Sequence, residues 1–398
     1  MLNRIVMVCA LLLLGLGIAV EAQAKDVDPE AKGIQAGGFV MHPGAKVSLG
    51  YNDRGSQGSD DGLIDVGVHF RTRMADDKAY TWDNNISFKW RQFWGVGSAN
   101  PNGGPDVVVS SQADLMKEKF FRIAPNASYS YVNDPEDDNL RKDYENHRVK
   151  AGIGFYFQPD GGKIFSQRIG YKFNGQFYTE HSDVSHVVNT IDSVTRWNFF
   201  PNTSMSLMID FRIISYLEDK PFIVGAEAPA SANSTSLPVR LKYGLQGLLL
   251  ARLSYSLGLG YAYENYKNGM TEHMFIMNAR VRYDFNDHNG IYLEYKKDFD
   301  NVIYGDYYKF HRVTLGYDAC FADSFTVNAE AGLGVFDFRN FTQIERKDFL
   351  VTGSVGLYYH FFPGLKLGLD YRLRYNKSDM ENSSYVKNYV TLGLAYEY

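Results

Sequence analysis

Basic residues recur two positions apart at several places in this chain. Such pairs are Arg71 and Arg73, Lys89 and Arg91, Arg148 and Lys150, Arg240 and Lys242, Arg280 and Arg282, and Arg372 and Arg374. Residues two apart project from the same face of a β-strand, so each pair would place two positive charges side by side. Clustered cationic side chains bind carboxylates and phosphates. These residues therefore suggest anion binding, provided that the segments around them are strands.

Residue arrangements that would support catalysis are weak. The nine His residues show no H-E-x-x-H spacing, and no G-x-S-x-G sequence occurs. His181, Ser182 and Asp183 are neighbours in the sequence, which does not by itself make a catalytic triad. We therefore expect a protein that is not an enzyme, with no catalytic residue, no cofactor and no metal site.

The segments around the basic residues alternate between apolar and polar side chains. Clear apolar sets at every second position are Val47, Leu49 and Tyr51; Ile153, Phe155 and Phe157; Leu207, Ile209 and Phe211; Leu257, Leu259 and Tyr261; and Leu369, Tyr371 and Leu373. A period of two predicts β-strands, and segments of about ten residues or more suit tilted strands that cross a membrane. We expect the apolar positions to face lipid and the positions between them to face a lumen.

The connections between these strands favour a membrane barrel over a soluble sandwich. Tight turns are predicted at Ile123–Asn126, Gln158–Gly162, Phe199–Asn202, Asn286–Gly290 and Phe361–Gly364, and longer polar segments at 95–117, 133–147, 218–236, 266–271, 337–346 and 376–384. Short turns on one side and long loops on the other are typical of outer-membrane barrels. Because such barrels have an even number of strands, we take a turn at Ala124–Asn126 to divide one long segment, which gives about 18 strands. The predicted fold class is all-β, a single transmembrane antiparallel β-barrel over residues 44–398.

The beginning of the chain predicts secretion. A short basic start, an apolar run over residues 6–20 and the sequence Ala22-Gln23-Ala24 indicate a signal peptide at 1–24, followed by a periplasmic N-terminal segment at 25–43. Cys9 lies inside the apolar run, whereas a lipidated cysteine would end it. Its removal leaves Cys320 as the single cysteine, so we expect no intramolecular disulfide.

The last strand is predicted to carry a membrane-insertion signal. Val390, Leu392, Leu394, Tyr396 and Tyr398 point to one side of it and end on an aromatic residue. This is how chains inserted into the bacterial outer membrane end. We therefore expect a location in the outer membrane of a Gram-negative bacterium, with its lipids and the barrel-assembly machinery as partners.

Inward positions carry more positive than negative charge. The basic residues predicted to face the lumen are Arg71, Arg73, Lys89, Arg91, Arg148, Lys150, Arg168, Lys172, Arg196, Arg212, Arg240, Lys242, Arg252, Arg280, Arg282, Lys296, Arg312, Lys366, Arg372 and Arg374. The acidic ones are Asp65, Asp192, Asp210, Glu264, Asp284, Glu294, Asp298, Asp300, Glu330 and Asp370. Cations outnumber anions about two to one by this count, and rings of Arg or Lys favour anions in a pore. Alternatively, many of these residues form cross-strand ion pairs that only keep the wall polar.

Charge and loop composition add two further expectations. The net charge of −5 argues against a strongly basic protein that binds nucleic acid. The two longest loops, at 95–117 and 218–236, contain the apolar stretches Val107–Val109 and Phe222–Val224. Either loop could fold inward as a constriction, or both could pack as ordinary loops.

The opening of the barrel resembles that of a known family. Met41-His-Pro-Gly-Ala-Lys-Val-Ser-Leu-Gly-Tyr-Asn-Asp-Arg54, followed by an acidic loop and Gly62-Leu-Ile-Asp-Val-Gly-Val68, is similar to the start of outer-membrane β-barrels associated with exopolysaccharide and capsule synthesis. In that family a run of Asp and Asn follows the Tyr, and Asn52-Asp53-Arg54-Gly55 matches it in part. The resemblance implies an outer-membrane channel that passes a secreted polysaccharide outward with a periplasmic polysaccharide-export protein.

Three functions follow from these expectations. The first is translocation of a secreted polysaccharide, which the basic lumen predicts to be acidic. The second is a passive porin for small anionic solutes. The third is a structural or adhesive outer-membrane barrel.

Overall fold

The computed structural model describes residues 33–36, 38–53, 61–76, 79–94, 104–117, 119–132, 145–179, 182, 185–200, 202–218, 235–267, 271–301, 307–322, 324–339, 345–380 and 384–398. The predicted signal peptide at 1–24 and residues 25–32 of the predicted N-terminal segment lie outside these ranges, as do residues 219–234 of one predicted constriction loop.

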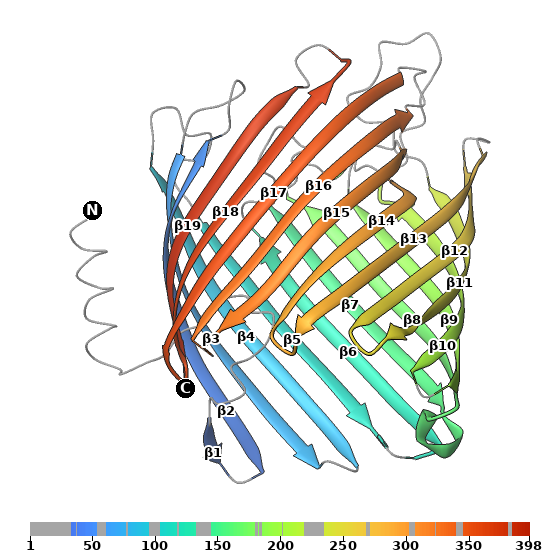
Figure 1. The fold of residues 1–398 in the computed structure, drawn as a ribbon, viewed down its shortest axis with the longest axis horizontal. Coiled ribbons are helices and arrows are strands. Elements are labelled where there is room, and N and C mark those ends of the chain that lie inside the picture. Colours follow the sequence, from blue (N-terminus) through green and yellow to red (C-terminus); the bar gives the residue numbers. More distant parts are fainter. Residues whose placement is uncertain are drawn as a thin grey trace.

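The described residues form strands almost throughout (Figure 1). The strands are β1 (Ile34–Ala36), β2 (Phe39–Asp53), β3 (Asp61–Asp76), β4 (Tyr80–Trp94), β5 (Gly104–Leu115), β6 (Phe121–Val132), β7 (Asn146–Phe157), β8 (Phe165–Tyr178), β9 (His186–Phe200), β10 (Thr203–Tyr216), β11 (Ser236–Leu250), β12 (Leu253–Tyr266), β13 (Thr271–Asn286), β14 (Asn289–Asn301), β15 (Tyr307–Phe321), β16 (Phe325–Arg339), β17 (Glu345–Phe362), β18 (Leu365–Ser378) and β19 (Tyr385–Glu397). A 3₁₀ turn, Pro159–Gly162, follows β7. No helix in these ranges is long and apolar enough to cross a membrane.

The strands close into an antiparallel barrel. Each of the 18 strands from β2 to β19 pairs with its neighbours in sequence, and β19 returns to β2 with Val390 opposite Tyr51. β1 adds a short third partner to the edge of β2. Closure leaves no sheet edge at the ends of the chain, which satisfies the backbone hydrogen-bonding groups in lipid. The predicted fold class is confirmed.

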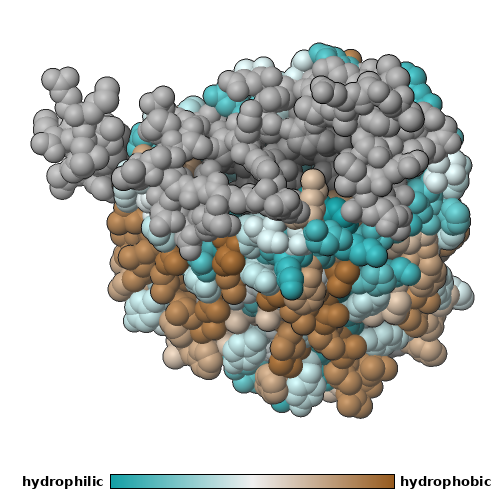
Figure 2. Space-filling model, turned by 90° about the horizontal axis from the view of Figure 1, so that it is seen from above, coloured by the Kyte–Doolittle hydropathy of each residue, from teal (hydrophilic) through white to brown (hydrophobic). Residues whose placement is uncertain are grey.

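Burial along each strand is the reverse of that in a soluble protein. On β10, Leu207 and Ile209 are 44% and 46% exposed, whereas Asp210 between Ile209 and Phe211 is only 6% exposed. The same inversion recurs around the barrel, and Figure 2 shows hydrophobic side chains gathered in patches over its side. Apolar side chains that point outward from a closed barrel require lipid as their solvent.

Tight connections gather at the end of the barrel where the chain terminates (Figure 1). Four of the predicted turns are confirmed there, between β7 and β8, β9 and β10, β13 and β14, and β17 and β18. Gly364, between β17 and β18, has φ +90°, a conformation in which a side chain would be strained. This end corresponds to the periplasmic side of outer-membrane barrels, and the opposite end to the extracellular side.

Outward aromatic side chains mark both rims of the barrel. Phe120 packs edge-on against Phe121 and Phe157 near the short-turn end, with ring centroids 4.9 and 4.4 Å apart. Towards the opposite end, outward Tyr295 and His311 lie 2.8 Å apart between the Tyr hydroxyl and Nδ1. Aromatic girdles of this kind lie at the two membrane surfaces.

Two local predictions were wrong. One split a real strand in two and the other missed a strand, so the predicted total of about 18 strands was still correct. Ile123–Asn126 is not a turn, because it lies within β6, where Pro125 pairs with Ile153 of β7. Residues 104–115 of the predicted loop at 95–117 form β5, and Val107 and Val109 pair with outward residues of β4. That loop therefore cannot supply Val107–Val109 as an inward constriction. The first barrel strand also begins at Phe39, so Pro43 lies inside it.

Candidate functional site in the barrel lumen

Many of the predicted lumen cations are neutralised by carboxylates. The pairs are Arg71 with Glu397, Arg73 with Asp83, Lys89 with Asp106, Arg91 with Asp65, Arg168 and Lys172 with Asp192, Arg212 with Asp210, Arg240 and Lys296 with Asp298, Arg280 with Glu294, and Arg282 with Asp284 and Asp318. The ion-pair alternative therefore accounts for a large part of the predicted set.

The most deeply placed of these pairs joins Arg91 of β4 to Asp65 of β3. Their side chains are 10% and 9% exposed, and Arg91 Nε donates to Asp65 Oδ1 over 2.8 Å. The two residues are also direct cross-strand partners. A pair this enclosed has little surface left for a solute, so its contribution is to the stability of the wall.

A second group of predicted cations has no carboxylate within 4 Å among the described residues. It consists of Arg148, Lys150, Arg196, Lys242 and Arg312. Arg148 instead donates to the side-chain oxygen of Asn146 over 3.1 Å. Charges that no protein group neutralises remain available to attract a solute of opposite sign.

Four predicted cations remain. Arg252 donates to the Phe285 carbonyl oxygen, and Lys366, Arg372 and Arg374 lie over aromatic rings. The guanidinium carbons of Arg372 and Arg374 on β18 lie 5.9 and 5.8 Å from the ring centroids of Tyr389 and Tyr385 on β19. These distances are within the range of cation–π attraction.

Several of the unneutralised cations gather on one side of the lumen. The strand register places Arg196 of β9, Ser206, Gly244, Gly258, Asn278, Lys296 and Arg312 of β15 successively opposite one another. Gly258 leaves room that Lys242 fills, because a Cβ there would lie 2.6 Å from Lys242 Cε. We call Arg196, Lys242, Lys296 and Arg312 the basic wall. Among the residues that the structure describes, the one carboxylate within 4 Å of these four cations is Asp298, 3.9 Å from Lys296.

Inward aromatic residues are a feature that the sequence analysis missed. Tyr292 of β14 is 7% exposed and lies against Gly316 of β15, where any Cβ would overlap its ring. Arg280 of β13 covers the ring, with Cζ 3.9 Å from its centroid, and the Tyr292 hydroxyl donates to Glu330. Glycine, tyrosine and arginine thus form three layers from the wall towards the lumen. The layers hold the guanidinium in place without using its N–H groups.

Similar layers occur elsewhere in the barrel. Tyr156 lies beside Gly154, with the guanidinium carbon of Arg122 4.6 Å from its ring centroid. Tyr358 lies against Gly368, with Lys366 Nζ 4.6 Å from its ring. Each tyrosine lies an even number of residues from the inward residues of its own strand. This spacing is the feature of the sequence that could have predicted its inward position.

The extracellular half of the lumen is narrowed by β14. β13 and β14 stop pairing after Met277 and Lys297, although both strands continue. Beyond that point Phe299 turns inward and is 1% exposed, in a cluster with the inward residues Ala262, Met274 and Ile276 of β12 and β13. The end of β14 therefore lies over the inner faces of these two strands.

Two polar contacts fasten this inward segment. Arg240 of β11 donates through Nη2 to the Phe299 carbonyl oxygen over 2.7 Å. Lys309 of β15 reaches past β14 to Glu272 of β13, with 2.7 Å between Nζ and Oε1. The constriction is thus built from a strand end, and not from the Val107–Val109 stretch.

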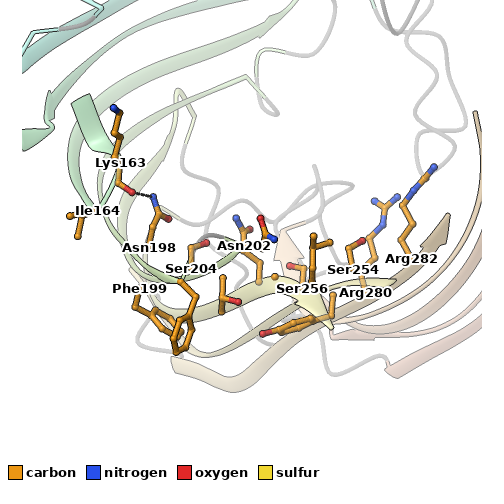
Figure 3. Close-up of a pocket in the computed structure, with 16 residues that line it drawn as sticks. Lys163, Ile164, Asn198, Phe199, Asn202, Ser204, Ser254, Ser256, Arg280 and Arg282 are labelled. Atoms are coloured by element: carbon orange, nitrogen blue, oxygen red, sulfur yellow. Dashed lines mark hydrogen bonds between the residues drawn. The ribbon is translucent and has the colours of Figure 1, made fainter. Parts of the chain in front are cut away.

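A recess with both polar and apolar lining residues opens at the short-turn end of the lumen along β9 to β13 (Figure 3). Its volume is about 740 Å³. Its inner surface includes Asn198, Ser204, Gln246, Ser256, Arg280 and Arg282. Asn198 Nδ2 donates to the Lys163 carbonyl oxygen over 2.9 Å, which ties the recess to the turn after β7 (Figure 3). We refer to this cavity as the recess.

No cluster of His, Cys, Asp and Glu that could hold a metal ion occurs within the described ranges. Cys320, on β15, is a free thiol.

Comparison with known proteins finds similarity in structure only. No protein-family model and no curated protein sequence matches the chain. Among solved structures, OpdQ of Pseudomonas aeruginosa aligns with a TM-score of 0.52 at 10% identity, over 90% of this chain and 98% of its own. A BenF-like porin from Pseudomonas fluorescens Pf-5 aligns with a TM-score of 0.52 at 11% identity, over 90% and 98%. The outer membrane protein OpdK of P. aeruginosa gives 0.52 at 9% identity, over 90% and 99%.

The likeness shows a shared fold. That fold is a closed bacterial β-barrel, and its apolar outer surface identifies lipid as its surroundings. Bacterial barrels of this architecture lie in the Gram-negative outer membrane, so the predicted location is confirmed.

Proposed function

We propose that the protein is a passive porin for small anionic solutes. The observation that carries the proposal is the basic wall, in which Arg196, Lys242 and Arg312 have no carboxylate within 4 Å among the described residues. A solute that passes this side of the lumen meets uncompensated positive charge, which lowers the barrier for anions and raises it for cations.

Two observations favour a porin over the polysaccharide exporter that the family resemblance implies. One of the similar solved structures is described as a porin and none of the three as an exporter, although similarity at this level of identity is an analogy for function. The inward end of β14 also reduces the cross-section that a long polymer would need. The porin is therefore the function that we propose, and export is an outcome of the test.

The test is ion selectivity in a planar bilayer. The full chain, reconstituted between unequal KCl solutions, should give a reversal potential of the sign expected for chloride permeation. The triple variant Arg196→Gln, Lys242→Gln and Arg312→Gln should lower the chloride-to-potassium permeability ratio by roughly threefold or more, because the neutralised residues supply the excess charge. Equal permeability of the two ions in the unmodified protein would refute the proposal.

A matched control removes as much charge from elsewhere. Lys119, Lys347 and Lys377 are exposed and lie outside the basic wall, in the turn after β5 and on β17 and β18. Their joint replacement by Gln should leave the permeability ratio unchanged. Deletion of the gene should likewise leave surface polysaccharide unchanged while it slows uptake of small anions. Loss of polysaccharide that the intact gene restores would instead support export.

A further inference from the structure

The two arginines of the recess differ in how their donors are used. Arg282 donates through Nε to Asp284 over 2.7 Å and through Nη1 to Asp318 over 2.8 Å. Arg280 has a carboxylate at 3.6 Å, Glu294, and makes no hydrogen bond to any described residue. The guanidinium of Arg280 therefore keeps donors for a ligand, whereas that of Arg282 is already engaged.

Arg280 is also held ready for binding. Its guanidinium carbon lies 3.9 Å from the Tyr292 ring centroid, and that ring is fixed between Arg280 and Gly316. The Arg280 side chain nevertheless remains 40% exposed. A guanidinium that is already ordered loses less conformational entropy when it binds a ligand. The planar fork also matches the two oxygens of a carboxylate or phosphate.

The inner surface of the recess also carries neutral hydrogen-bonding groups, beside apolar residues such as Leu248 and Tyr255. Ser204, Gln246 and Ser256 make no side-chain hydrogen bond to any described residue. Hydroxyl and amide groups both donate and accept hydrogen bonds, as the hydroxyl groups of a sugar do. Figure 3 shows Ser204 and Ser256 on the surface that leads to Arg280. The guanidinium of Arg280, which keeps free donors, thus stands near several neutral polar groups.

We propose that the recess binds organic anions that carry several hydroxyl groups, of the chemical class of sugar acids. The carboxylate would bind to Arg280, and the hydroxyl groups to Ser204, Gln246 and Ser256. A volume of about 740 Å³ is within the usual size of small-molecule sites and accommodates one or two sugar rings. The inference rests on the proposed porin function and names the solute that the porin retains at its periplasmic end.

Three probes separate charge from hydroxyl recognition. Isothermal titration of the full-length protein in detergent would compare glucuronate, which has both features, with acetate, which has only the charge, and glucose, which has only the hydroxyls. Glucuronate should bind with a dissociation constant at least about tenfold lower than either of the others, because both sets of groups contribute. Equal binding of acetate and glucuronate, or of glucose and glucuronate, would overturn the proposal.

Matched variants locate the site. Arg280→Lys and Arg282→Lys each keep the charge of the recess and differ only in which guanidinium is lost. Arg280→Lys should weaken glucuronate binding about tenfold, since an ammonium cannot replace the stacked fork, and Arg282→Lys should change it less than twofold. Equal effects of the two changes would refute the assignment of Arg280. The double change Ser204→Ala and Ser256→Ala should reduce the preference for glucuronate over acetate without weakening acetate binding.

Failure of this inference can be told apart from failure of the porin proposal. Binding in detergent does not depend on conduction, and ion selectivity in a bilayer does not depend on hydroxyl recognition. An anion-selective channel that binds acetate as well as glucuronate would retain the porin and reject the recess. A channel with equal ion permeabilities that binds glucuronate through Arg280 would do the reverse.

Discussion

Replacement of Phe299 by Ala should widen the extracellular half of the lumen. Phe299 is 1% exposed, and its ring fills the space between the end of β14 and the inner faces of β12 and β13. Truncation of a fully buried Phe to Ala costs about 3 to 5 kcal/mol. Each 1.4 kcal/mol changes a population ratio about tenfold. The ratio of the inward to the released position of the segment should therefore fall by roughly 100-fold or more.

The hydrogen bond from Arg240 to the Phe299 carbonyl survives this change, because it uses a backbone atom. It contributes about 1.5 to 3 kcal/mol, less than the packing that is lost. We therefore expect the segment to exchange between fastened and released positions. Single-channel recordings should show a higher mean conductance and new transitions between conductance levels.

Phe349→Ala provides the control for this experiment. Phe349 lies on β17 and is 42% exposed on the outer face, so the same truncation there leaves the lumen intact. Its conductance should equal that of the unmodified protein. If Phe299→Ala also left both the mean conductance and its fluctuations unchanged, the end of β14 would not be the constriction.

Three further changes test other parts of the structure. Asp65→Asn leaves the enclosed Arg91 guanidinium without its counter-charge and should destabilise the barrel by about 3 kcal/mol, measured as a lower urea midpoint of the folded band on a gel. Gly316→Ala should displace the Tyr292 ring and weaken glucuronate binding several-fold in the same titration. Tyr398→Ser, at the end of the predicted insertion signal, should reduce the fraction of protein that the barrel-assembly machinery inserts, measured in membrane extracts.

Each of these changes has a matched control. Asp83→Asn breaks the Arg73 pair, whose side chains are 56% and 29% exposed, and should cost less than about 1 kcal/mol. Gly353→Ala places a methyl group where the nearest neighbouring atom is 3.9 Å away, so glucuronate binding should persist. Tyr375→Ser removes an outward tyrosine from β18 and should leave insertion intact. If a control variant had the same effect as the test variant it is matched with, the cause given for that test variant would be wrong.

Much of the fold could be predicted from the sequence because burial in a barrel wall repeats every second residue. The alternation of Leu207, Ile209 and Phe211 with polar residues gave the correct face without knowledge of any neighbouring strand. Pro125 was misleading because its effect depends on which of the two neighbouring strands it faces, which the sequence alone does not show. Pro125 lacks an N–H group and suggests a turn, yet a barrel strand has two neighbours, and β6 keeps its full pairing with β7 where its register with β5 is interrupted.

The candidate site was only partly predictable, because it depends on contacts between strands. Arg280 and Arg282 share one strand and one face, and only the positions of Glu294, Asp284 and Asp318 decide which of them keeps free donors. No property of the segment around Arg280 distinguishes it. Ion pairing is set by register, whereas the sequence pattern gives only the face.

The inward tyrosines could not be predicted for the same reason, because the sequence does not show which residues of neighbouring strands lie opposite one another. Tyr292 has the parity of the inward residues, but an aromatic residue in a barrel strand is ordinarily assigned to the lipid face. Its inward position is possible because Gly316, on the neighbouring strand, has no side chain. A tyrosine and its glycine must therefore be considered together.

The separation of β14 from β13 also makes the wall mechanically uneven. From Thr271 to Ile276, β13 is paired with β12 and has no ladder partner on its β14 side among the described strands. Where neighbouring strands are paired, an opening of the wall must break backbone hydrogen bonds in succession, whereas here side-chain contacts such as that of Lys309 with Glu272 are what must break. Backbone amides of β13 that face this gap should exchange with deuterium before those of the other strands, and any sideways breathing of the barrel should begin there.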